Sequence, residues 1–250
     1  MGLLVIATAY LAWRHYRDVP LLFWGALVNV PLVGLQGLLG AVTVLRELPP
    51  EIVATHLVTA MLVLSIEVVI FTAMLREDPD RSFALSESMR AAGRSVGARA
   101  VVALAGLTAT VWFGGFITEN GAALACEGWP DCNGSLIPAR DNKEVMHMLH
   151  RYLAAGGMLL LVPVAVGAWR NAAVLSWGAA VSILLAGLYG LQVGVGAFNV
   201  FFTFPSALTV AHTTVAATIW VVLVVAAVLG YYEPARERRG TKLQDSEVSA

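Results

Sequence analysis

The chain repeats itself without a gap at an offset of 156 residues. Segment 35–41 aligns with segment 191–197, and the same offset places His56 on His212. Each copy therefore keeps a histidine twenty residues after a glutamine. Self-similarity of this kind indicates a repeated structural unit. We expect two similar halves, built from the same helical elements.

Composition favours a membrane protein over a soluble domain. Hydrophobic residues make up 58% of the chain and charged residues 13%, and the mean hydropathy is +0.74. Apolar runs of about twenty residues are typical of membrane helices, which satisfy their own backbone hydrogen bonds in lipid. The sequence predicts six complete spans, at roughly 21–45, 51–75, 99–118, 143–169, 172–198 and 206–230. No basic face suggests nucleic acid as a partner.

The first thirteen residues are apolar but short. As a helix they would extend about 20 Å, whereas a bilayer core needs about 30 Å. A signal peptide is the competing interpretation, and it fails because no basic region precedes the apolar stretch and segment 13–17 is not a cleavage site. The repeat places the counterpart of His150 before Met1. We therefore expect the outer part of this first helix to be absent.

Lysine and arginine predict the orientation in the membrane. Twelve of them fall on one side, which we expect to be cytoplasmic: Arg14, Arg17, Arg76, Arg81, Arg90, Arg94, Arg99, Arg170, Arg236, Arg238, Arg239 and Lys242. The other side carries four: Arg46, Arg140, Lys143 and Arg151. Loop 119–142 is then extracytoplasmic, and a disulfide between its two cysteines, Cys126 and Cys132, is expected there. The C-terminus lies in the cytoplasm, in a multi-pass protein of the cell membrane.

Three histidines lie at similar depths in predicted helices. His56, His150 and His212 each follow the outer end of a helix by six or seven residues, which is about 10 Å. Ionisable side chains inside a membrane usually serve a function. Two imidazoles on opposite faces of one iron make a bis-histidine haem site, and His150 with His212 is the natural pair because both lie in one copy. The alternative is that each histidine hydrogen-bonds a neighbouring helix; zinc is disfavoured because ligands are too few.

Other polar residues accompany the histidines, and each leaves two interpretations open. Gln36 and Gln192 either hydrogen-bond across helices or orient a ligand. Arg151 either pairs with a haem propionate or anchors the helix at the interface. Glu67 is too deep to act at the iron of His56 and is either packed or directed towards the cytoplasmic side. The cysteine pair either shapes the outer loop or exchanges electrons.

The combined motifs resemble the haem A synthase family. The second half matches it in Gly-Gly-Phe-Ile-Thr (114–118), Gly-Ala-Ala-Leu-Ala-Cys (121–126), Trp-Pro-Asp-Cys-Asn-Gly (129–134) and His-Met-Leu-His-Arg (147–151). The first half matches in Leu-Gln-Gly-Leu-Leu-Gly (35–40) and in His56. The resemblance covers nearly all of residues 2–230.

The resemblance implies an all-α membrane protein of two similar antiparallel four-helix bundles, related by internal duplication. Residues 1–75 would form an incomplete first bundle for the substrate haem, 76–98 a cytoplasmic linker, 99–230 the second bundle with haem b, and 231–250 a cytoplasmic tail. The family oxidises the methyl group of haem O to a formyl group, giving haem A for terminal oxidases. Carried over by position, His150 and His212 would ligate haem b and its iron, and His56 would lie in the substrate site.

The family's first helix and first outer loop have no counterpart in this sequence, and the catalytic glutamate expected there is absent with them. We therefore expect this chain to bind haem b and not to complete catalysis. Implied partners are membrane lipid, haem O, haem O synthase and an unidentified electron acceptor, with a homo-oligomer left open. Two other classes stay open: a bis-histidine b-type cytochrome for electron transfer, and a non-catalytic haem carrier or assembly factor.

Overall fold

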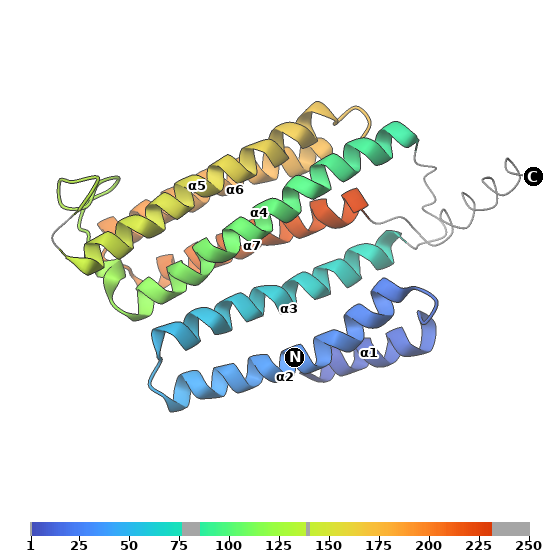
Figure 1. The fold of residues 1–250 in the computed structure, drawn as a ribbon, viewed down its shortest axis with the longest axis horizontal. Coiled ribbons are helices and arrows are strands. Elements are labelled where there is room, and N and C mark those ends of the chain that lie inside the picture. Colours follow the sequence, from blue (N-terminus) through green and yellow to red (C-terminus); the bar gives the residue numbers. More distant parts are fainter. Residues whose placement is uncertain (1, 77–85, 139–140, 232–250) are drawn as a thin grey trace, which may run out of the picture.

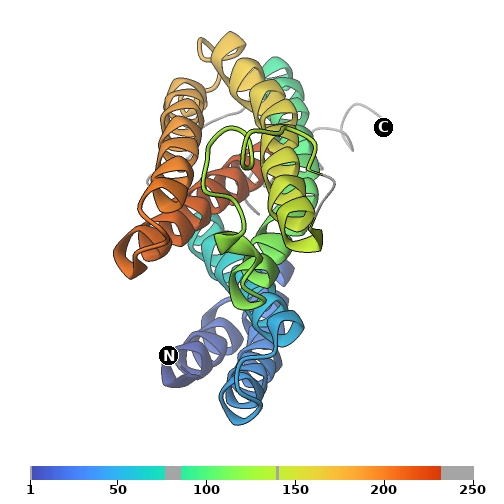
Figure 2. The same cartoon turned by 90° about the vertical axis from the view of Figure 1, so that its left-hand side faces the viewer.

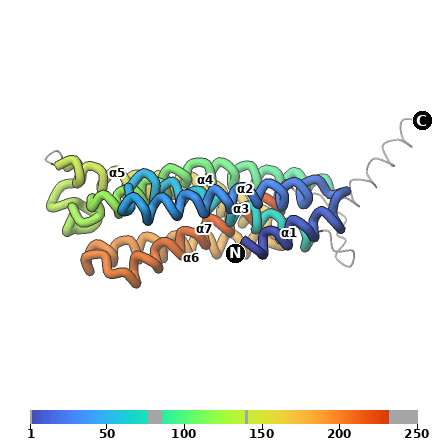
Figure 3. Tube along the Cα trace, turned by 90° about the horizontal axis from the view of Figure 1, so that it is seen from below, coloured from blue at the N-terminus to red at the C-terminus, as the bar shows by residue number. Residues whose placement is uncertain are grey.

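The computed structural model describes residues 2–76, 86–138 and 141–231, which form seven α-helices and one short 3₁₀ helix, η2 (Ala122–Leu124). In chain order the α-helices are α1 (Gly2–His15), α2 (Pro20–Leu45), α3 (Pro50–Arg76), α4 (Glu87–Glu119), α5 (Asn142–Arg170), α6 (Gly178–Phe201) and α7 (Ser206–Tyr231). They lie side by side along one axis (Figures 1 and 3). The all-α prediction is confirmed.

Six helices, α2 to α7, are long and apolar enough to cross a membrane, which makes the chain a multi-pass membrane protein. Helix α1 has 14 residues and extends about 21 Å. The predicted span 99–118 lies inside α4, which begins earlier, at Glu87, where the Ser86 hydroxyl caps it by accepting from the Met89 amide at 3.3 Å. The predicted start of the next span but one, at 172, is wrong. Helix α6 begins at Gly178 instead of 172, because Asn171 ends α5 and a turn follows.

The predicted linker 76–98 is therefore partly helical, since α4 includes its second half. Residues 77–85 lie outside the described part of the chain, as does almost all of the predicted tail 231–250. The predicted division into two bundles stays a prediction.

Helices α4 to α7 form a closed ring. Helix α4 packs against α5 and α7, and α6 packs against the same two helices, so α5 and α7 face each other across the ring. Figure 2 looks along the helices and shows this ring above helices α1 to α3, which are coloured blue to cyan. Helix α3 lies against α4 and α7, with α2 and then α1 further out. Across the α3–α7 contact the Trp220 indole donates to the Ser65 hydroxyl at 2.7 Å.

Glycines allow α4 and α7 to approach closely at the end of the ring remote from the disulfide loop. A Cβ on Gly93 would lie 3.4 Å from the Gly230 carbonyl oxygen, and one on Gly97 would lie 3.3 Å from the Ala227 oxygen. Small residues spaced by four along a membrane helix permit such backbone contact. This contact closes the ring on the side that faces α3.

The turns α2–α3 and α6–α7 have the same backbone geometry at the 156-residue offset. Glu47 and Leu48 have φ values of 56° and 60°, and Thr203 and Phe204 have 59° and 55°. The Leu48 amide donates to the carbonyl of residue 43 at 2.8 Å, and the Phe204 amide to that of residue 199 at 2.7 Å. Two successive non-glycine residues in the left-handed region are uncommon. The repeat in the sequence is thus matched by a repeat in local structure.

Both of these turns and the disulfide loop lie at one end of the molecule (left in Figure 1), and the α1–α2 and α5–α6 turns lie at the other. Arg14, Arg76 and Arg170 belong to the last turns of α1, α3 and α5, at this second end. The chain therefore crosses back and forth in the order that the arginine distribution predicts. Which end faces the cytoplasm stays a prediction.

Candidate functional site: histidines inside the helical bundle

The repeated histidine and glutamine contact each other in both halves. Gln36 Nε2 lies 3.3 Å from His56 Nε2 across the α2–α3 contact, and Gln192 Nε2 lies 3.2 Å from His212 Nε2 across the α6–α7 contact. The cross-helix hydrogen bond that the sequence left open as one role for these glutamines is therefore present. Whether they also orient a ligand is a separate question.

A glycine four residues after each glutamine makes room for the imidazole. A Cβ on Gly40 would lie 3.1 Å from His56 Cε1, and a Cβ on Gly196 would lie 3.1 Å from His212 Cε1. Residues four apart share one face of a helix. One face of α2, and the matching face of α6, thus combines an amide that contacts the ring edge with a gap that admits the ring.

His150 occupies a similar position on α5 but has different neighbours. A Cβ on Gly114 of α4 would lie 2.9 Å from His150 Cε1, so this ring also needs a glycine. Four residues before that glycine stands Thr110, whose hydroxyl donates to the Leu153 carbonyl at 3.5 Å. His150 therefore has the space beside a glycine, but Thr110 stands where the other two sites have a glutamine.

His150 and His212 belong to α5 and α7, the two helices that face each other across the ring. In each ring Nδ1 is buried and has no hydrogen-bond partner among the described residues. Burying a polar nitrogen without a partner costs free energy. Two such imidazoles on facing helices, each against a glycine, fit a haem whose iron takes one nitrogen from each side. The residues present therefore fit the group.

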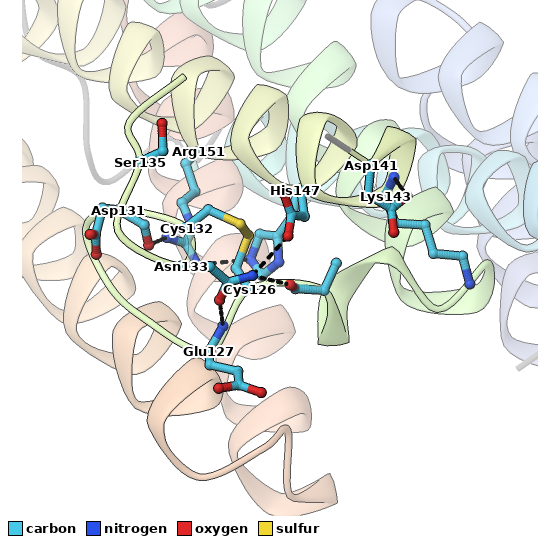
Figure 4. Close-up of a disulfide and its surroundings, with 12 residues drawn as sticks. Cys126, Glu127, Asp131, Cys132, Asn133, Ser135, Asp141, Lys143, His147 and Arg151 are labelled. Atoms are coloured by element: carbon cyan, nitrogen blue, oxygen red, sulfur yellow. Dashed lines mark hydrogen bonds between the residues drawn. A yellow bond between two sulfur atoms is a disulfide. The ribbon is translucent and has the colours of Figure 1, made fainter. Parts of the chain in front are cut away.

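The predicted disulfide is confirmed. Cys126 and Cys132 are bonded (Figure 4) and almost fully buried. Met148 of α5 packs against them. Asn133 holds the loop around the bridge: its side-chain oxygen accepts from the Glu127 amide at 3.0 Å, and its nitrogen donates to Glu144 at 2.9 Å. The loop is thus attached to the first turns of α5, close to His150 in the sequence.

Arg151 ties the loop to the helix that carries His150. Its guanidinium donates to the carbonyl oxygens of Pro130 and Asp131 at 3.2 and 2.7 Å and lies 3.2 Å from His147 Nε2 (Figure 4). The structure thus gives Arg151 a role as a loop anchor. The predicted contact with a haem propionate stays a prediction.

His147, which the sequence analysis did not count among the site residues, is the most buried histidine of this region at 3% exposure. Its ring meets Phe204 of the α6–α7 turn edge-on, with centroids 6.2 Å apart. It thereby joins Arg151, the loop and that turn into one cap over the end of the bundle. Its position one turn before His150 is the sequence feature that could have revealed it.

Glu67 lies far from the histidines, as expected, and is packed against a polar partner. Asn29 Nδ2 of α2 donates to Glu67 Oε1 at 2.6 Å, and Asn29 is only 1% exposed. This pair lies between α2 and α3, so it belongs to the first half of the chain.

The fold and the site define a class: an all-helical membrane protein with a pair of histidines inside a four-helix ring and a disulfide loop over one end. Known proteins narrow this class. The family model described as cytochrome oxidase assembly protein (COX15-CtaA) matches residues 1–224. The chain therefore belongs to the family of cytochrome oxidase assembly proteins and haem A synthases.

Individual relatives are more distant. The haem A synthase of Alkalihalophilus pseudofirmus is 28% identical over 194 residues, which cover 74% of this chain and 62% of that protein. The haem A synthase of Shouchella clausii is 31% identical over 165 residues, 65% of this chain and 53% of that protein. A protohaem IX farnesyltransferase of Halobacterium salinarum is 36% identical over 121 residues, 48% of this chain and 27% of that protein. The matched segments thus span 62% and 53% of the lengths of these two haem A synthases.

Proposed function

We propose that this chain acts in haem A synthesis. In this reaction the methyl group of haem O is oxidised to a formyl group, and the product, haem A, serves terminal oxidases. Within the chain, helices α4 to α7 bind a resident haem b between His150 and His212. The observation that carries this proposal is the arrangement of those two histidines, on facing helices of one ring, each beside a glycine that leaves room for its imidazole.

The protein's own groups hold and orient the haem. His150 and His212 would ligate the iron, and Gly114 and Gly196 leave the space in which the rings stand. The surrounding apolar helices exclude water, which strengthens electrostatic interactions inside the site. When bound, the haem supplies one-electron redox chemistry at its iron.

His56 is the proposed ligand in the substrate site of the first half. Its contacts with Gln36 and Gly40 match those of His212 with Gln192 and Gly196, which supports a second planar ligand at the same depth. The disulfide loop, anchored by Arg151, would cover the extracytoplasmic end of the second bundle. The cytoplasmic end would then carry the last turns of α3 and α5 and the C-terminus.

The comparison with a protein named protohaem IX farnesyltransferase supports a link to the haem pathway, because farnesylation of protohaem precedes the proposed reaction chemically. Haem O is then the substrate and its synthase a natural partner. Membrane lipid surrounds the helices, and an electron acceptor completes the oxidation.

The first test is spectroscopic. The purified protein, supplied with haem b, should show a low-spin bis-histidine spectrum that is lost in both His150→Ala and His212→Ala. His56→Ala is the matched control and should keep the spectrum. If both variants in the second half retain the low-spin signal, the assigned ligands are wrong.

The second test concerns the reaction. Cells that make haem O are compared with and without the gene for this protein, expressed together with its upstream sequence. Extracted pigment should contain haem A only when the gene is present. Bound haem b without any haem A would instead support a b-type cytochrome that transfers electrons.

A further inference from the structure

The two repeated glutamines each contact Nε2 of a histidine, the ring nitrogen proposed to bind iron. In both halves the amide nitrogen lies 3.2–3.3 Å from the Nε2 atom of the histidine. Imidazole binds haem iron through one ring nitrogen whose lone pair is free, and a hydrogen bond to the other nitrogen decides which tautomer is present. The glutamine therefore stands at the position that matters for ligation.

The first half fixes which end of the amide faces the ring. Gln36 Nε2 lies 3.1 Å from the backbone carbonyl oxygen of His56, and a carbonyl oxygen only accepts hydrogen bonds. The Gln36 side-chain atom beside this carbonyl oxygen is therefore the amide nitrogen, which only donates. Since the same nitrogen contacts the ring, His56 Nε2 must be the acceptor, and the ring proton resides on Nδ1.

The matching geometry extends this assignment to the second half. Gln192 and Gly196 flank the His212 ring as Gln36 and Gly40 flank that of His56. In both pairs Nδ1 of the histidine and Oε1 of the glutamine are buried without a partner among the described residues. An amide turned the other way would place its oxygen against Nε2 and would require the opposite tautomer.

We infer that Gln192 is a positioning residue: it donates to His212 Nε2 in the haem-free protein, keeps the ring proton on Nδ1, and is displaced when iron takes that lone pair. This inference rests on the proposed haem site of α4 to α7. It assigns to Gln192 a role in loading the haem, and it assigns no such residue to His150, whose neighbour Thr110 donates to a backbone carbonyl.

Two substitutions separate the donor role from mere packing. Gln192→Leu removes the donor. Gln192→Glu keeps the shape but presents a carboxylate, which only accepts and therefore favours the proton on Nε2. Gln36→Leu is the matched control, because it makes the same change in the first half.

The experiment uses the full chain in detergent, labelled with ¹⁵N-histidine, and records two quantities. Nitrogen chemical shifts in the haem-free protein report the tautomer of His212, and titration with haem b reports affinity. We expect the wild type to carry its proton on Nδ1, Gln192→Leu to mix tautomers and bind haem about tenfold more weakly, and Gln192→Glu to shift the proton to Nε2 and bind more weakly still. Gln36→Leu should leave His212 and its haem unchanged.

The outcomes are distinguishable. An unchanged tautomer in both Gln192 variants, or equal losses of affinity without a change of tautomer, would overturn the inference. A wild type that binds no haem would refute the proposed function, while the tautomer of His212 would still be read from the haem-free sample. Unperturbed signals of His56 in the Gln192 variants, and of His212 in Gln36→Leu, show that each variant is folded.

Discussion

The α2–α3 pair and the α6–α7 pair share their sequence pattern, turn geometry and glutamine–histidine contact, yet they differ in what lies beside them. Helix α7 faces α5 and His150 across a closed ring, whereas α3 packs against α4 and α7 and has no facing histidine among the described residues. Local structure thus follows the repeat, and the surroundings decide what each histidine can bind. Substitutions at four places in the molecule test this difference between the two halves.

The largest effect is expected from filling the space beside the histidine. Gly196→Val would place side-chain carbons where even a Cβ lies 3.1 Å from His212 Cε1, so the ring must leave its position. We expect complete loss of the low-spin haem spectrum. Gly40→Val makes the same change beside His56 and should retain it.

Gly187→Val on α6 is the control for helix propensity, because a Cβ there meets no atom within 4 Å. Absorption spectra of the three purified variants, each with haem b added, provide the measurement. A normal spectrum in Gly196→Val would show that His212 is not a ligand.

The second difference is a polar pair that has an apolar counterpart. Asn29 and Glu67 are hydrogen-bonded between α2 and α3, while Leu185 and Leu223 occupy the same positions in the second half, buried in its core. Asn29 Nδ2 finds its partner in Glu67, while Asn29 Oδ1 is buried without a partner among the described residues. Glu67→Leu alone leaves the buried Asn29 amide without its partner, which costs about 1–3 kcal/mol.

Replacing both members by leucine should recover most of that loss, because the leucine pair copies the second half. Thermal unfolding in detergent of the single and double variants measures the coupling. If Glu67→Leu leaves the thermal stability unchanged and the double variant is no more stable than the single one, the pair does not stabilise the α2–α3 contact. A role of Glu67 in function would then be supported.

A third prediction concerns the cap over the second bundle. Arg151→Met removes two hydrogen bonds to the carbonyl oxygens of Pro130 and Asp131, so the loop should open more often and expose the buried cysteines. We expect the rate of disulfide reduction by an added thiol to rise about tenfold, since bonds to a charged group contribute about 1.5–3 kcal/mol each and part is regained from water.

Arg151→Lys keeps the charge without the planar fork and should give an intermediate rate. Quenching with a thiol-alkylating reagent at timed intervals follows the reaction. Equal rates in wild type and Arg151→Met would show that Asn133 and the packing of Met148 hold the loop by themselves.

The sequence predicted the parts of this molecule that depend on periodicity and pairing. Six apolar runs gave six spanning helices, and the only two cysteines gave the disulfide. The predicted span start at 172 was wrong because a turn separates α5 from α6 there, and α4 begins before the predicted span at 99 because hydropathy marks where lipid begins and not where the helix begins. Ser86 caps α4 well before its apolar stretch, and that information lies in a single hydroxyl.

The contacts of the site were predicted less well, because they depend on side-chain geometry between helices. The sequence placed Gln36 and Gln192 at matching positions but could not tell a hydrogen bond to histidine from one to a ligand. It also left Arg151 open between a haem propionate and an interfacial anchor, and it did not foresee that the guanidinium donates to loop carbonyls about twenty residues away in the chain. Only the folded loop brings those carbonyls to the arginine.

The smallest expected effect concerns the repeated turn. Thr203 and Glu47 have left-handed backbone conformations, with φ of 59° and 56°. A β-branched residue suffers more in this region than an unbranched one, and asparagine tolerates it. Thr203→Asn should therefore raise the free energy of unfolding by about 0.5–1 kcal/mol, and Glu47→Asn by less. Thermal unfolding of both variants in detergent tests this ranking. A larger gain in stability at Glu47 would mean that the two turns share a backbone conformation but are not equally strained.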